Sequence, residues 1–178
     1  RGEMAVAQER IAQALNEAYA AGYIGKNILG TELSVDIVLH WGAGAYVVGE
    51  ETALIESLEG NRGMPRLKPP YFPASIGLYG QPTIVNNVET LSNLPWILSN
   101  GSEAFKAIGT ETSPGTRMVA VSGHVKRPGV YEIVNGTTTF RDLIYGETMC
   151  GGIRNDAALK AFVPGGGSAP WFTADQLD

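Results

Sequence analysis

The fold prediction starts from one stretch, Gly42-Ala43-Gly44-Ala45-Tyr46-Val47-Val48-Gly49-Glu50-Glu51-Thr52. Residues 34–41, which precede it, alternate apolar and polar side chains as a strand does. Residues 52–58, which follow it, have the spacing of a short helix. A strand, a glycine-rich turn and a helix in this order are typical of open α/β sheets, in which ligands bind beyond the strand ends. The sequence therefore predicts an α/β domain with a ligand site at this turn.

The same stretch lacks the Gly-Lys-Ser/Thr ending of a phosphate-binding loop. Glu50 and Glu51 stand at the predicted helix start, where carboxylates interact favourably with the helix dipole but repel a phosphate. They offer hydrogen-bond acceptors to amide N–H groups or ribose hydroxyls, or they only stabilise the helix start. If the two carboxylates lie close together, we expect one pKa to be raised. Tyr46 either stacks on a planar ligand ring or packs as an ordinary core aromatic.

Outside this stretch, residues 4–20 have the periodicity of an amphipathic helix. Residues 60–82 hold several prolines, which remove backbone donors and fix φ, so an extended loop is expected there. Residues 86–98 and 101–108 are predicted to be helical.

Two groups of side chains in this part of the chain have open interpretations. Arg66, Lys68 and Phe72 either bind the phosphates and base of a nucleotide or belong to a surface loop that packs on its own helix. Asn86 and Asn87 precede a helix, with a glutamate placed as in a capping box, or their amides donate to a ligand.

A second domain is expected after a change of composition at residues 110–117. Strands are predicted at 118–122, 130–134 and 159–163, with a helix from Thr139 to Tyr145. Two strands, a helix and a returning strand indicate a small β-grasp-like domain.

Composition excludes several classes of function. The 178 residues are 44% hydrophobic and 17% charged, which is typical of a globular protein. The net charge of −5 argues against nonspecific nucleic-acid binding, and no apolar run approaches the roughly 20 residues of a membrane span. The single cysteine, Cys150, excludes an internal disulfide and any iron–sulfur cluster ligated wholly by this chain. With His40 and His124 it is too sparse a set for a zinc site, and no serine has the context of a hydrolytic nucleophile.

Several strings, in one order along the whole chain, resemble the flavin- and NADH-binding subunit of respiratory complex I. They are Gly42–Tyr46, Gly49–Leu54, Ser57–Gly60, Pro65–Pro70 and Asn86–Thr90. The diaphorase subunits of NAD-linked hydrogenases and formate dehydrogenases share them.

The resemblance implies a domain plan. Residues 1–110 would be the C-terminal part of an FMN- and NADH-binding, Rossmann-like α/β domain. Residues 116–168 would be a β-grasp domain of the soluble-ligand-binding (SLBB) type. Residues 169–178 would begin a linker to a helical bundle that carries a 4Fe-4S cluster.

The resemblance also implies the activity of an NADH:quinone oxidoreductase. NADH transfers a hydride to FMN, and electrons pass to the iron–sulfur clusters of partner subunits. Because the cofactors carry this chemistry, no catalytic side chain and no metal ligand of the protein is expected. The implied cofactor-binding residues are Tyr46, Gly49, Glu50 and Glu51 along the flavin and nicotinamide, Lys68 and Phe72 at the dinucleotide, and Val85, Asn86, Asn87 and Thr90 around FMN. Tyr71 is one residue more than the family pattern has before its phenylalanine.

In the family, the loop that binds the FMN phosphate lies upstream of the matching region, and the cluster cysteines lie downstream. We therefore expect the chain to be an internal part of the subunit, with negligible NADH dehydrogenase activity alone and no 4Fe-4S cluster of its own. The expected location is cytoplasmic, at the inner membrane only through partner subunits, without direct insertion. The alternatives are a diaphorase subunit of a hydrogenase or formate dehydrogenase, and a non-catalytic β-grasp docking module.

Overall fold

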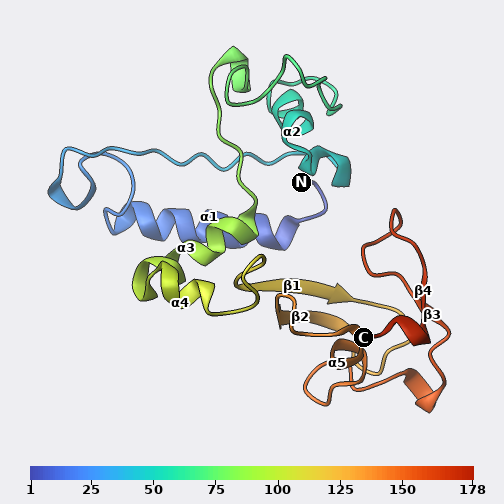
Figure 1. Ribbon diagram of the computed structural model, residues 1–178. Helices are drawn as coiled ribbons and strands as arrows, with labels where there is room; N and C mark the ends of the chain where they lie inside the picture. The colour runs from blue at the N-terminus through green and yellow to red at the C-terminus, as the bar shows by residue number, and fades with distance from the viewer. The chain divides into compact units, whose positions relative to one another are not determined.

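The computed structural model describes residues 1–178, which divide into two compact units, Arg1–Val85 and Asn86–Asp178 (Figure 1). The sequence places its domain boundary later, at residues 110–117, and the domain boundaries stay a prediction.

The first unit is built from two helices and three short 3₁₀ turns. Helix α1 spans Ala5–Ala20 and helix α2 spans Glu51–Leu58, which confirms both predicted helices. The 3₁₀ turns are η1 (Ile28–Gly30), η2 (Tyr46–Gly49) and η3 (Leu78–Gly80). As predicted, residues 60–82 contain no long helix and no strand.

The predicted strand at 34–41 is wrong. This segment runs extended between η1 and η2 (Figure 1), but its only ladder contact is an isolated bridge between Val35 and Gly25. A strand needs a hydrogen-bonded neighbour along its length, and beyond that bridge no other segment pairs with this one as a strand. The alternating side chains therefore stay exposed, as Val35 (43%) and Ile37 (46%) show.

The start of α2 is the best-packed part of the first unit. Thr52, Ala53 and Ile55 are at most 1% exposed, and Val48 from η2 is 7% exposed. A Cβ on Gly44 would lie 2.5 Å from Cγ2 of Val48, so glycine is needed for this close approach. The N-terminal segment joins the same region, where Gly2 donates its N–H to the carbonyl of Gly44 at 3.2 Å.

The second unit begins with helices α3 (Val88–Asn100) and α4 (Ser102–Lys106), which confirm the two predicted helices. The side chain of Asn87 caps α3 by accepting from the N–H of Glu89 at 2.8 Å. The predicted capping box is wrong, because the carboxylate of Glu89 accepts instead from the N–H of Met118 at 2.7 Å. This bond ties α3 to the start of the first strand.

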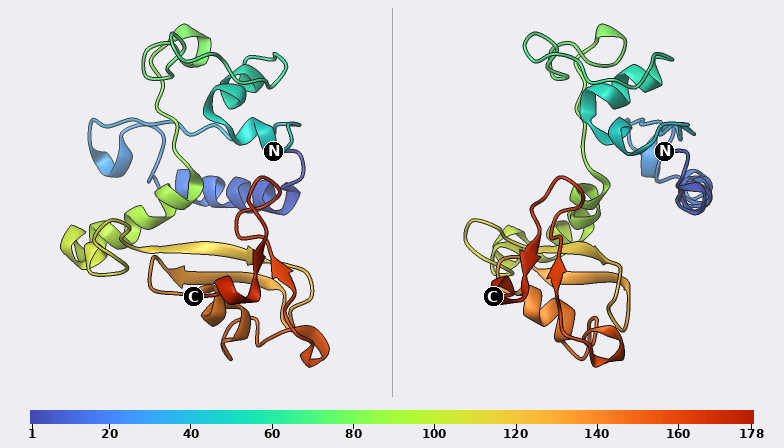
Figure 2. Two further views of the ribbon diagram at one scale, coloured as in Figure 1. Left: turned by 45° about the vertical axis from the view of Figure 1, so that its right-hand side comes forward. Right: turned by 90° about the vertical axis from the view of Figure 1, so that its right-hand side faces the viewer.

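Strands β1 (Thr116–Val121) and β2 (Gly129–Val134) pair antiparallel, with Val119 opposite Tyr131. Helix α5 (Phe140–Tyr145) lies against one side of this hairpin (Figure 2). After turn η4 (Arg154–Asp156), strand β3 (Ala161–Phe162) pairs with β4 (Phe172–Thr173), and turn η5 (Ala174–Gln176) follows. The returning strand of the predicted β-grasp is thus present but short, and its partner is β4.

The core of the second unit joins distant parts of the sequence. Its buried members are Val125, Ile144, Cys150, Ile153 and Leu177. Three phenylalanine rings pack beside it, Phe140, Phe162 and Phe172, with centroids 4.9 to 6.1 Å apart. Residues 169–178, expected to begin a linker, thus contribute side chains to this packing. In neither unit is there a helix of the length and apolarity that crossing a membrane requires.

Candidate functional site

Glu50 is the N-cap of α2. Its Oε2 accepts hydrogen bonds from the N–H groups of Thr52 and Ala53, both at 2.9 Å, and from the Thr52 hydroxyl at 2.6 Å. An N-terminal helix turn leaves several backbone donors free, and a side-chain acceptor here satisfies two of them. The helix-stabilising interpretation of Glu50 is therefore confirmed.

These contacts favour the ionised form of the Glu50 carboxylate. Desolvation by burial raises the pKa of Glu50, but it is outweighed by hydrogen bonds from Thr52, Ala53 and Lys68, which together lower the pKa to about 2. For Glu50 the expected rise in pKa is wrong, because the hydrogen-bond donors favour the charged form more than burial opposes it.

Lys68 bridges the two glutamates. Its Nζ lies 3.1 Å from Oε1 of Glu50 and 2.7 Å from Oε1 of Glu51. The hydrogen bond to Glu51, followed by that to Glu50, raises the pKa of Lys68. Oε2 of Glu51 makes no hydrogen bond within the protein, and the Glu51 side chain is 40% exposed. The cluster of Glu50, Glu51 and Lys68 thus carries one net negative charge and has one carboxylate oxygen without a partner in the protein.

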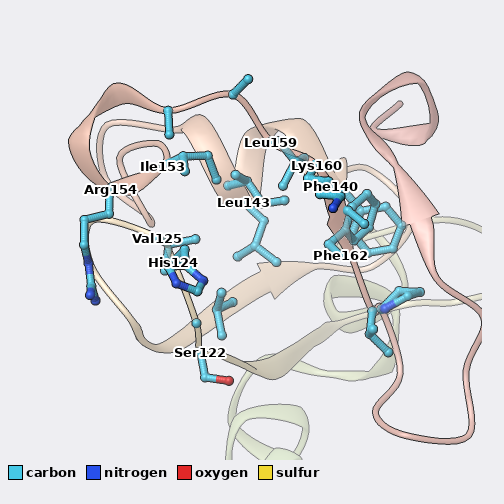
Figure 3. A pocket seen from close by; sticks show the side chains of 18 of the residues that line it. Ser122, His124, Val125, Phe140, Leu143, Ile153, Arg154, Leu159, Lys160 and Phe162 are labelled. Carbon is cyan, nitrogen blue, oxygen red and sulfur yellow. The ribbon is translucent and has the colours of Figure 1, made fainter.

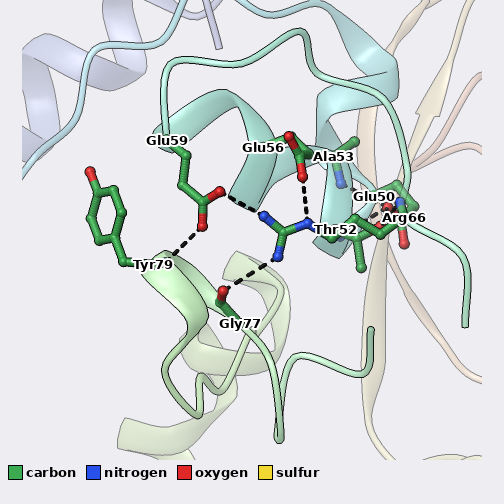
Figure 4. Close-up of polar contacts among 8 residues, drawn as sticks. All are labelled: Glu50, Thr52, Ala53, Glu56, Glu59, Arg66, Gly77 and Tyr79. Atoms are coloured by element: carbon green, nitrogen blue, oxygen red, sulfur yellow. Dashed lines mark hydrogen bonds and ion pairs between the residues drawn. The ribbon is translucent and has the colours of Figure 1, made fainter. Parts of the chain in front are cut away.

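Arg66 is held by two glutamates of α2 and its C-cap, Glu56 and Glu59 (Figure 4). Its guanidinium lies 2.5 Å from the carboxylate of Glu56 and 2.7 Å from that of Glu59, and it donates to the carbonyl of Gly77 at 3.3 Å. The Arg66 side chain is only 13% exposed. The interpretation of Arg66 as a phosphate ligand is therefore disfavoured, since its charge is already paired, and the alternative of a loop that packs on its own helix is right for this residue.

A buried hydroxyl connects this network to Glu50. Thr52, which is fully buried, accepts from the N–H of Arg66 at 2.8 Å and donates to Glu50. Sequence reasoning missed Thr52, Glu56 and Glu59 as a set. Their spacing of i, i+4 and i+7 places them on one helix face. Two acids at this spacing, followed by an arginine in the proline-rich loop, could have indicated the ion-pair network.

Tyr46 presents an open aromatic surface. Its side chain is 86% exposed, so the core interpretation is wrong for this residue. The guanidinium carbon of Arg1 lies 5.6 Å from the ring centroid, a cation–π distance. Three residues later, Gly49 has space around it, because the atom nearest to an added Cβ would be Nη1 of Arg1 at 3.8 Å.

The other predicted site residues divide between the two units. Phe72 and the neighbouring Tyr71 are 50% and 42% exposed, on the loop that follows Lys68. Val85 ends the first unit, half-buried. Asn86, Asn87 and Thr90 belong to the second unit and are exposed, with the Asn87 side chain engaged as the cap of α3.

The residues of the first unit gather several ligand-binding types of group in one place. They supply an exposed aromatic face, a free carboxylate oxygen and an ammonium within one short region around the start of α2. They hold no cluster of side chains suited to a metal ion.

Residues 1–96 match the family described as the Nuo51 FMN-binding domain, and residues 118–170 match the SLBB domain. The whole chain is 51% identical to a subunit of the NADH-quinone oxidoreductase of Streptomyces coelicolor, of which it covers 38%. It is 49% identical to the corresponding subunit of Mycobacterium tuberculosis, of which it covers 39%. The chain thus spans less than half the length of these curated relatives.

A solved structure agrees with these matches. The crystal structure of an NAD⁺-reducing [NiFe]-hydrogenase in the air-oxidised state superposes with a TM-score of 0.68 and 42% identity, over 81% of this chain and 24% of that one. These findings confirm the mixed α/β class with an SLBB domain. The chain belongs to the family of the Nuo51 FMN-binding domain.

Proposed function

We propose that this chain is the central part of the flavoprotein subunit of an NADH:quinone oxidoreductase, which oxidises NADH and passes the electrons to partner subunits. The observation that carries the proposal is the family match over residues 1–96, because it contains the exposed Tyr46 and the Glu50–Glu51–Lys68 cluster. The 51% and 49% identical relatives support the same function.

In this proposal the Glu50–Glu51–Lys68 cluster binds and orients the nicotinamide end of NADH. Bound FMN supplies the hydride-accepting chemistry. Lys68 fixes Oε1 of Glu51, which leaves Oε2 to accept from the carboxamide N–H or a ribose hydroxyl of NADH. The one net negative charge favours the cationic oxidised nicotinamide ring over the neutral reduced ring. Tyr46 offers a stacking surface, and the open space at Gly49 lets a planar ring approach the backbone.

We extend the proposal to the other cofactor contacts. Lys68 and Phe72 would contact the dinucleotide, and Val85, Asn86, Asn87 and Thr90 would line the FMN pocket. The 4Fe-4S cluster would be ligated by cysteines outside this chain, since the sequence holds one cysteine. The complete subunit would be cytoplasmic and would reach the inner membrane through iron–sulfur partner subunits.

Glu51→Gln tests the proposal in the complete subunit. The substitution removes the charge but keeps the shape, and Glu51 is not the residue that caps α2. We expect the KM for NADH in ferricyanide reduction to rise about tenfold, as the loss of one charge-assisted hydrogen bond predicts. The melting temperature should stay within about 2 °C.

Glu32→Gln is the matched control, because Glu32 is exposed in the same unit and makes no ion pair. Its kinetic constants should equal those of the unmodified subunit. An unchanged KM and kcat in Glu51→Gln would remove Glu51 from the proposed site.

The second candidate is a diaphorase subunit of an NAD-linked hydrogenase, and the 42% identical hydrogenase structure favours it. Both candidates oxidise or reduce the same nucleotide, so the subunits that copurify with the complete protein discriminate between them. Copurification of a nickel-containing subunit would favour the hydrogenase, and NADH-dependent quinone reduction by the copurified assembly would favour the main proposal.

A further inference from the structure

The second unit contains an open cavity of about 690 Å³ (Figure 3). Its floor is formed by side chains of the hydrophobic core, among them Val125, Leu143 and Ile153, which are 6 to 8% exposed. Phe140 and Phe162 add aromatic surface. Known small-molecule sites have volumes of about 300–1,000 Å³ and mostly apolar walls, so both the size and the lining of this cavity suit a small ligand.

The charged groups around the cavity are all of one sign. Arg154 and Lys160 line it, and no aspartate or glutamate does, although the whole chain carries a net charge of −5. Neither cation forms an ion pair. The acid next to them in the sequence, Asp156, is paired with Lys126 at 2.5 Å. Figure 3 shows Arg154 with His124 toward one end of the cavity and Lys160 beside the phenylalanines toward the other.

From the apolar floor and the uncompensated cations we propose that this cavity binds an anionic amphiphile, a carboxylic acid with an aliphatic or aromatic body. The body would cover the floor around Leu143 and Ile153, where burial of apolar surface is favourable. The carboxylate would pair with Arg154 or Lys160, which provide charge-assisted donors. Such a site is separate in its chemistry from the proposed nucleotide contacts, which are built around a net negative cluster in the other unit.

Decanoate is the probe, added to the isotope-labelled 178-residue chain below its micelle concentration and followed by ¹H–¹⁵N NMR. We expect saturable shifts at the amides of residues 119–125 and 153–163. Acetate, which has the headgroup alone, and decyltrimethylammonium, which has the opposite charge, should leave these amides unchanged. Equal binding of decanoate and the cationic analogue would overturn the proposal, since the cavity would then select only for apolar surface.

Two variants locate the site. In the double variant R154Q/K160Q, decanoate should bind about tenfold more weakly, because the charge-assisted pair is lost. The control R62Q/K26Q makes the same change of net charge at exposed residues of the other unit that form no ion pair, and it should bind within about twofold of the unmodified chain. Ala158→Trp adds bulk at the cavity wall without burying a charge, and it should also weaken binding.

Equal affinities of R154Q/K160Q and its control would contradict the proposal. Shifts at other residues only would contradict it as well. Shifts of these same amides on raising the protein concentration without decanoate would identify a second copy of the chain as the occupant, which would also overturn it.

Discussion

At the scale of single residues, Glu50 connects folding and the proposed function. One oxygen of its carboxylate closes the start of α2, and the other accepts from Lys68. The residue that looked like the pair of Glu51 in the sequence is therefore mainly structural, and Glu51 holds the free acceptor. Adjacent identical residues differ here because only the first of them occupies the N-cap position.

Glu50 should make the stability of the first unit depend on pH. Its pKa is lowered on folding to about 2, so the ionised carboxylate stabilises the fold above its ordinary pKa of 4.5. That contribution is lost as the pH falls from about 4.5 to about 2. Glu50→Gln should therefore lower the free energy of unfolding by about 1 kcal/mol at pH 7, and by much less at pH 2.5. Urea unfolding followed by circular dichroism measures both, and a difference that does not change with pH would contradict this assignment.

Arg66 should matter for stability more than any exposed arginine. Its removal leaves the carboxylates of Glu56 and Glu59 without their cation in a mostly buried position. Breaking a fully buried ion pair costs about 3–5 kcal/mol, and for this partly buried network we expect Arg66→Met to cost about 2 kcal/mol. Arg62→Met, at an exposed residue without an ion pair, should cost less than about 0.5 kcal/mol. Equal urea midpoints for the two variants would show that the network is not stabilising.

At the scale of elements, the sequence predicted the helices, whose formation depends on residues close together in the chain. Helices α1, α2 and α5 were found because apolar spacing and caps are local signals. The segment 34–41 has an equally regular pattern, but a strand also needs a partner, which a single segment cannot reveal.

The candidate site likewise divides into features that local sequence indicates and features that depend on contacts between distant segments. The family strings pointed to Tyr46, Glu51 and Lys68, which the structure shows to be an exposed aromatic ring and an ion pair at the start of α2; their ligand-binding roles stay a prediction. They did not reveal that Arg66 is neutralised by Glu56 and Glu59, because that depends on how the proline-rich loop folds back on α2.

The cap of α5 provides a prediction for a single element. The Thr139 hydroxyl accepts from the N–H of Asp142 at 3.1 Å, and the Asp142 carboxylate accepts from the N–H of Thr139 at 3.0 Å. Thr139→Ala removes half of this capping box and should lower the free energy of unfolding by about 1 kcal/mol. Thr112→Ala, at an exposed threonine with no hydrogen bond from its hydroxyl, is the control. Similar thermal midpoints for the two variants would refute a stabilising cap.

At the scale of the whole molecule, the two units have separate cores. The first is centred on Thr52, Ala53 and Ile55, and the second on the cluster that includes Ile144 and Leu177. Units that each have their own core can open separately.

Ile144→Ala tests whether the units are independent. The buried side chain is 6% exposed, so its truncation should cost about 3 kcal/mol in the second unit. In native-state hydrogen exchange, the amides of Cys150 and Gly152, which donate to the carbonyls of Leu143 and Ile144, should lose about 100-fold of their protection. The amides of Leu54 in α2 and of Glu59, the C-cap residue of α2, should change less than about threefold. Ile55→Ala, at a residue 1% exposed, should give the reverse pattern. Equal loss in both units from either variant would mean that the chain unfolds as one cooperative body.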